Sequence, residues 1–166
     1  STGAVLNQGT LSAADGGFVA LLAPEVRNEG VIVARAGTVA LAAGETVQLD
    51  FADGGLGSVQ VTAAKLKTLV ENRHAIVAPD GYVILAARSA DALRSGLVNQ
   101  TGVIDAGSLV SRGGRVLLEG DEITLAAGSR IDASGATGGG TVHVGGGGQG
   151  GGGTHQATKV RMAAGA

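Results

Sequence analysis

The chain has 166 residues, about the length of one domain, and its composition limits the kinds of protein it can be. Glycine supplies 31 residues and aromatic residues only 2%, so a core must be built from small aliphatic side chains. The formal net charge of −2 argues against a nucleic-acid-binding surface, and the absence of cysteine excludes disulfides and thiolate metal sites. The longest apolar stretch, residues 18–24, is too short to cross a membrane.

Short repeats run along the chain from its start. A shift of 21 superposes Asn7 on Asn28, and a shift of 44 carries Asn28 onto Asn72. The first shift is the length of one unit and the second is the length of two, which predicts one divergent unit in between. The last matching units are residues 122–127, 131–133 and 141–144.

Within each unit, apolar residues alternate with small or polar residues over three to five positions, which is the period of a half-buried strand. Clusters of Gly, Asn and Asp separate these strands and favour tight turns. A unit of this size cannot bury its own apolar face, so neighbouring units must stack. The pattern predicts an all-β parallel β-helix; a β-sandwich is the alternative fold for strands at this spacing.

Stacked units should align their apolar residues inside the helix as a continuous column. The candidate core residues recur at matching positions of three units: Val39, Leu41, Val83, Leu85, Val116 and Leu118. A lipid-binding groove is the other interpretation of such a ladder, but the period of two with small neighbours favours an internal stack.

Two segments, residues 62–70 and 89–98, depart from the strand period. Their Leu and Val residues lie at helical spacing behind a Thr or a Ser that could cap a helix. We therefore expect two short, matched helical excursions on the outside of the coil.

The C-terminal part has a different composition. Eight of the nine residues 145–153 are glycine, which is typical of a linker or loop. Residues 158–162 alternate again and could form one more strand, on this coil or on a neighbouring molecule. We divide the chain into β-helix coils over residues 1–146 and a Gly-rich linker with a possible terminal strand over residues 147–166, and identify Val160 and Met162 as a candidate assembly strand.

The two ends of such a helix expose unpaired backbone groups. The chain therefore either assembles end to end into filaments or has ends that are the cut edges of a longer rod. Both alternatives stay open at this point.

The run from Asn7 to Ala14, followed by residues 16–23, resembles the repeats of filamentous-haemagglutinin-type exoproteins of bacterial two-partner secretion. Residues 37–51, 81–87 and 126–146 are similar to the stretch that follows the secretion domain in that family. The resemblance implies a right-handed parallel β-helix that is secreted and works as the stalk or fibre of a surface adhesin. It also implies an outer-membrane transporter as partner of the parent protein, with host or cell-surface glycans as possible ligands and no membrane insertion.

Candidate chemistry is sparse. His74, His143 and His155 show no metal-ligand or catalytic spacing. Some parallel β-helices cleave acidic polysaccharides with clustered carboxylates and arginines, so one set of residues could form such a face: Asp105, Asp121, Glu122, Asp132, Arg112, Arg115 and Arg130. We expect no enzyme activity, cofactor or metal, and keep a carbohydrate-binding or polysaccharide-cleaving β-helix as the alternative.

Overall fold

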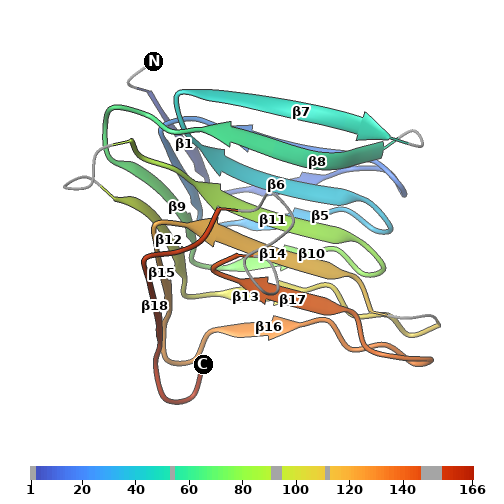
Figure 1. Cartoon of the computed structure of the whole chain (residues 1–166). Coiled ribbons are helices and arrows are strands. Elements are labelled where there is room, and N and C mark those ends of the chain that lie inside the picture. Colours follow the sequence, from blue (N-terminus) through green and yellow to red (C-terminus); the bar gives the residue numbers. More distant parts are fainter. Residues whose placement is uncertain (1–2, 53–54, 91–94, 111–112, 147–154) are drawn as a thin grey trace.

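A computed structural model describes residues 3–52, 55–90, 95–110, 113–146 and 155–166. In these residues all regular structure is β-strand, and three parallel sheets run the length of the molecule (Figure 1). The chain passes through sheet A, sheet B and sheet C in turn and then returns to sheet A one level further along. The fold is therefore the predicted parallel β-helix, and one passage through the three sheets is called a coil below.

The strands of each sheet follow one another in coil order. Sheet A contains β1 (Ala4–Asn7), β4 (Glu25–Asn28), β9 (Thr68–Asn72), β12 (Gly96–Gln100), β15 (Glu122–Leu125) and β18 (Lys159–Met162). Sheet B contains β2 (Thr10–Ser12), β5 (Val31–Val33), β10 (Ala75–Val77), β13 (Val103–Asp105) and β16 (Arg130–Asp132). Sheet C contains β3 (Phe18–Leu22), β6 (Thr38–Ala43), β11 (Tyr82–Ala87), β14 (Arg115–Gly120) and β17 (Thr141–Val144).

The register of these sheets agrees with the sequence shifts. Asn7 pairs with Asn28 and Asn28 with Asn72, while Val39 pairs with Val83 and Val83 with Val116. The predicted β-sandwich alternative is wrong, because all pairings among the three sheets are parallel.

The divergent unit between the matching repeats is not a coil. β4 pairs directly with β9, and the intervening residues form an antiparallel hairpin of β7 (Thr46–Ala52) and β8 (Gly55–Thr62). Figure 1 shows this hairpin lying near the N-terminal end of the stack. The expectation of a divergent coil is corrected: the extra residues leave the helix at one corner and return to it.

The hairpin covers the outer face of sheet C. Ala42, Ile84 and Ala86 point away from the interior and form a second apolar cluster with Val61 of β8. The Thr38 hydroxyl donates a 2.8 Å hydrogen bond to the carbonyl oxygen of Leu56. β6 is buried along its whole length for this reason, since one of its faces meets the interior and the other meets the hairpin.

The two predicted helical excursions are wrong in the described residues. Residues 68–70 belong to β9, and Val70 points into the core. Residues 96–98 belong to β12, while residues 91–94 lie outside the described part of the chain. Each segment combines residues of a connection with the first apolar residues of the next strand. The Leu and Val residues of the two parts together happen to lie at helical spacing. The two connections do match, since Ala64 and Ser89 form a parallel bridge.

Amide side chains form a second column inside sheet A, at the corner toward sheet B. Asn7 donates to Asn28 at 2.7 Å, Asn28 to Asn72 at 2.9 Å, and Asn72 to Gln100 at 3.0 Å. Asn28 and Asn72 also donate to backbone carbonyls of the following coil. The buried side-chain NH2 groups therefore find their acceptors in the next coil. Because these hydrogen bonds form only when the amides are aligned, they fix the register of the stack.

Candidate functional site

The predicted core residues all lie in the interior. Val39, Leu41, Val83, Leu85, Val116 and Leu118 belong to one apolar cluster that runs through the stack, and each is at most 2% exposed. A lipid-binding groove would need these side chains to be open to the outside. The ladder is instead the structural core of the rod.

Two of the candidate carboxylates lie on adjacent coils. Asp105 of β13 pairs in register with Asp132 of β16. Each caps the end of its own strand, because its carboxylate accepts a hydrogen bond from the backbone N–H two residues later: Gly107 for Asp105, at 3.0 Å, and Ser134 for Asp132, at 2.8 Å. These hydrogen bonds give both side chains a structural role at a corner.

Asp132 is strongly stabilised in its ionised form. The hydrogen bonds from Ser134, followed by the ion pair with Arg130, lower its pKa to about 2. A carboxylate in that state neither supplies nor stores a proton near neutral pH.

The rest of the acidic and basic set lies elsewhere. Asp121 and Glu122 stand at the start of β15 in sheet A, and Arg115 stacks on the Tyr82 ring on sheet C at 4.3 Å from its centroid. Arg112 lies outside the described residues. The described members of the set therefore do not converge on one face, and no three His, Asp or Glu residues gather as metal ligands within the described ranges.

The three histidines lie in different surroundings. His74 is exposed at a corner and His143 is exposed on β17. His155 is held in a polar socket: its Nε2 lies 2.6 Å from a carboxylate oxygen of Asp121, and its backbone N–H donates to Glu119 at 3.2 Å. The other ring nitrogen, Nδ1, lies 3.3 Å from the Arg88 guanidinium.

The C-terminal strand follows this socket. Ala157 packs against the core, and the Thr158 hydroxyl donates to the Asp121 carbonyl oxygen at 2.7 Å. β18 then pairs in parallel with β15, which places Val160 beside Ile123 and Met162 beside Leu125. The candidate assembly strand is thus the last strand of this chain's own sheet A, where Val160 is 46% and Met162 66% exposed.

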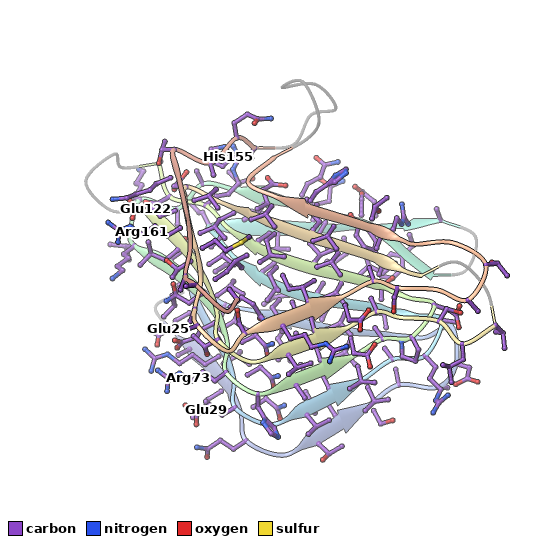
Figure 2. All side chains as sticks on the ribbon, turned by 90° about the horizontal axis from the view of Figure 1, so that it is seen from below. Glu25, Glu29, Arg73, Glu122, His155 and Arg161 are labelled. Carbon is purple, nitrogen blue, oxygen red and sulfur yellow. The ribbon has the colours of Figure 1, made fainter. Side chains whose placement is uncertain are left out.

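A chain of ion pairs crosses the outside of sheet A. Arg73 contacts Glu71 at 2.9 Å and Glu29 at 2.8 Å, and Arg27 contacts Glu25 at 2.7 Å. Figure 2 shows Glu25, Glu29 and Arg73 along one side of the molecule, with Glu122, Arg161 and His155 further along the same side. Glu29 and Arg73 are 44 residues apart, the same spacing that relates Asn28 to Asn72, so the repeat register held a signal for this contact that the sequence analysis did not use.

A groove lies at the N-terminal end of the described residues. It has a volume of about 510 Å³ and lies between the first corner of the coil, the start of the hairpin and residues 64–66. Its lining is mainly apolar, including Val5, Leu22 and Val47. Glu45 and Lys65 are its charged residues, so it lacks the convergent polar groups of a catalytic cleft.

Among the described residues, no helix is long and apolar enough to span a membrane.

The chain was compared with protein families, curated proteins and solved structures. No protein-family model and no curated protein sequence matches the chain. Among solved structures, the chain is similar to the crystal structure of the HMW1 secretion domain from Haemophilus influenzae, with a TM-score of 0.62 and 28% sequence identity. The match covers 98% of this chain and 49% of the other, so the chain spans about half of that domain.

This similarity supports a relationship to two-partner-secretion exoproteins, the broader group to which the sequence resemblance pointed. The match is to a secretion domain and does not single out the segment that follows one. The assignment to a filamentous-haemagglutinin-type protein remains a prediction.

Proposed function

We propose that the chain is a non-enzymatic, β-helical segment of a secreted bacterial surface adhesin or extracellular fibre of the filamentous-haemagglutinin type. The observation that carries this proposal is the 28% identity to a secretion domain over 98% of the chain. Two features of the chain support it: the interior is filled by a continuous aliphatic column, and the candidate catalytic carboxylates are dispersed or used as strand caps. The function would be mechanical, since hydrogen bonds along the axis make the stack stiff.

Secretion of the parent protein would then depend on an outer-membrane transporter. Expression of the parent protein with and without a two-partner-secretion transporter of the source bacterium tests this part. We expect the protein in the medium only when the transporter is present. Equal release from both strains would contradict the proposal.

The enzymatic alternative has its own test. We expect no cleavage and no saturable binding when the chain is incubated with polygalacturonate, alginate or dextran, with and without calcium. A lyase activity that is abolished by Asp105→Ala or Asp132→Ala would replace the structural proposal with the carbohydrate-active one.

End-to-end association into filaments is the finer part of the proposal. It is supported by the parallel stacking of all three sheets along one axis, because a stack of this kind can be extended by further strands. Contacts of this head-to-tail kind generate open filaments rather than closed rings.

A further inference from the structure

His155 is in contact with residues from two connections of the coil. Its ring nitrogen Nε2 lies 2.6 Å from Oδ1 of Asp121, the residue between β14 and β15. The other ring nitrogen, Nδ1, lies 3.3 Å from Nη2 of Arg88, the residue that follows β11. The backbone N–H of His155 donates to Glu119 of β14 at 3.2 Å. Both nitrogens of the ring are therefore engaged with charged side chains.

The Arg88 guanidinium decides which ring nitrogen carries the hydrogen. Arginine has only donors and stays protonated, so Nδ1 of His155 must be the acceptor. A neutral imidazole has one donor and one acceptor, so Nε2 carries the hydrogen and donates to Asp121. The other oxygen of that carboxylate, Oδ2, accepts backbone N–H groups from Gly96 at 2.6 Å and Ser89 at 3.2 Å. The contacts thus fit a neutral His155 ring with its hydrogen on Nε2.

The charged groups around the ring have opposite effects on a second proton. In the described part of the chain, the charged residues in contact with His155 are Asp121, Glu119 and Arg88. β8, which is in contact with Arg88, contains no charged residue. The two carboxylates attract a positive ring, whereas the guanidinium repels it. A proton added at Nδ1 would be placed on the side of the ring where the guanidinium lies.

Arg88 also connects this site to the hairpin. Its Nη1 donates to the carbonyl oxygen of Val61 in β8 at 3.1 Å. Nη1 and Nη2 belong to one rigid planar group, so they move together. Val61 is 6% exposed and packs with Ile84 and Ala86 in the second apolar cluster. A displacement of Arg88 at His155 is therefore transmitted to β8.

Protonation of His155 makes both ring nitrogens donors. The hydrogen on Nδ1 would then face the N–H groups of Arg88, and two positive charges would lie side by side. The hydrogen bond from Nε2 to Asp121 is kept and becomes an ion pair. Arg88 is the partner that has to leave, and its departure also removes the hydrogen bond to Val61.

We propose that His155 and Arg88 form a pH-sensitive tether for the β7–β8 hairpin, which is intact when the His155 ring is neutral and broken when the ring is protonated. Histidine is the side chain that ordinarily changes its charge between about pH 5 and pH 8. Opening of the hairpin uncovers Ala42, Ile84 and Ala86 on the outer face of sheet C. Mild acid therefore makes this apolar face accessible more often, a response that goes beyond the mechanical role proposed above.

The test measures hydrogen exchange of the backbone amides in the full chain by NMR at about pH 8 and about pH 5. The rates are expressed as protection factors, which correct for the intrinsic effect of pH on exchange. We expect protection in β8 to fall about threefold or more at the lower pH, as for the loss of one hydrogen bond. Protection in β9, inside the coil, should stay the same.

A substitution separates His155 from the other histidines. His155→Gln removes the titrating ring but keeps a donor and an acceptor for Asp121 and Arg88, so the fall in β8 protection should disappear. His143→Gln is the matched control, because His143 is exposed on β17. This control should show the same fall as the parent chain.

A second measurement needs no variant. Proton–nitrogen correlation spectra of the isotope-labelled full chain identify which nitrogen of each histidine ring carries the hydrogen. At about pH 8 we expect the His155 hydrogen on Nε2 alone. As the pH is lowered, the side-chain N–H signals of Arg88 should shift along the same titration curve as the His155 ring.

Three results would overturn the inference: a His155 hydrogen on Nδ1 in the neutral ring, equal β8 protection of the parent chain at both pH values, or a fall in β8 protection that persists in His155→Gln. The first two are obtained on the parent chain, so they hold even where the variant does not fold.

Discussion

Glycine at the corners of the coil is required by contact between coils. A Cβ atom on Gly30 would overlap the carbonyl oxygen of Gly9, which occupies the same corner one coil earlier. Gly9 itself, in the first coil, has nothing within 4 Å of its Cβ position. The same residue type at equivalent positions is therefore needed in one coil and optional in the other.

Gly30→Ala should lower the free energy of unfolding by about 2 kcal/mol or more, because the added methyl forces two coils apart. Gly9→Ala is the matched control and should stay within about 0.5 kcal/mol of the parent chain. Urea denaturation followed by circular dichroism measures both. Equal effects of the two substitutions would show that stacking contact is not the cause.

The amide column should be sensitive to a single gap. Asn28→Ala removes the buried hydrogen-bond partner of three groups: the Asn7 side-chain NH2, the Asn72 side-chain oxygen Oδ1 and the Ala75 backbone carbonyl oxygen. We expect a loss of about 2–4 kcal/mol of unfolding free energy, since each unpaired buried group carries a desolvation penalty. Gln8→Ala, at an exposed neighbouring site, is the control, and a loss for Asn28→Ala below about 1 kcal/mol would contradict this account.

Asp132 predicts an acid-sensitive contribution to stability. Its folded-state pKa of about 2 lies below the ordinary value of 3.8, so the ionised carboxylate stabilises the fold above that value. The contribution is lost as the pH falls from about 4 to about 2. The stability difference between the parent chain and Asp132→Asn should therefore shrink over this interval. Thermal midpoints of the parent chain and of Asp132→Asn, measured as a function of pH, test this prediction. Asp15→Asn is the exposed control. A stability difference between the parent chain and Asp132→Asn that stays constant with pH would contradict it.

The hairpin of β7 and β8 is a separate element packed on the coil. It buries the small outward residues of β6 and β11, and the Phe18 and Phe51 rings meet edge to face at 5.1 Å. The sequence holds a signal for this layer, because residues 38–43 and 82–87 are apolar at nearly every position rather than at every second one. Strands of that kind are covered on both faces.

Val61→Asp should detach the hairpin without unstacking the coil. Val61 is 6% exposed within the second apolar cluster, and an unpaired charge there is strongly unfavourable. We expect rapid proteolysis within residues 45–62 while the β-sheet circular dichroism is largely kept. Thr62→Asp, at an exposed site of the same strand, should remain resistant; loss of all β-structure in Val61→Asp would show that the hairpin and coil fold as one unit.

At the scale of the whole molecule, stability should vary along the axis. Among the strands that the structure describes, a central strand such as β9 pairs on both sides, whereas β1 and β18 each pair on one side only. In a stack with nearest-neighbour contacts, the ends therefore open first. Hydrogen exchange followed by mass spectrometry should show the strongest protection in β6, β9 and β11 and the weakest in β1 and β18. Uniform protection would indicate that the coils open together.

The sequence by itself determined the β-helix and its register. Stacked coils place equivalent residues on top of each other, so Asn7, Asn28 and Asn72 reveal their pairing through their spacing alone. The alternation of apolar residues likewise identified Val39, Val83 and Val116 as one internal column. Both the spacing and the alternation recur in several coils, so they can be recognised in the sequence without knowledge of the fold.

Only the tertiary structure decided what the non-repeating segments do. The antiparallel pairing of the hairpin and the His155 socket depend on which non-repeating residues the stack brings together, and spacing in the sequence carries no such information. The two expected helices were wrong because periodicity in a connecting segment is not tied to any packing partner. The sequence did not determine whether β18 pairs within this chain or with a neighbouring molecule. The structure places β18 beside β15, which is the next position in sheet A after five complete coils.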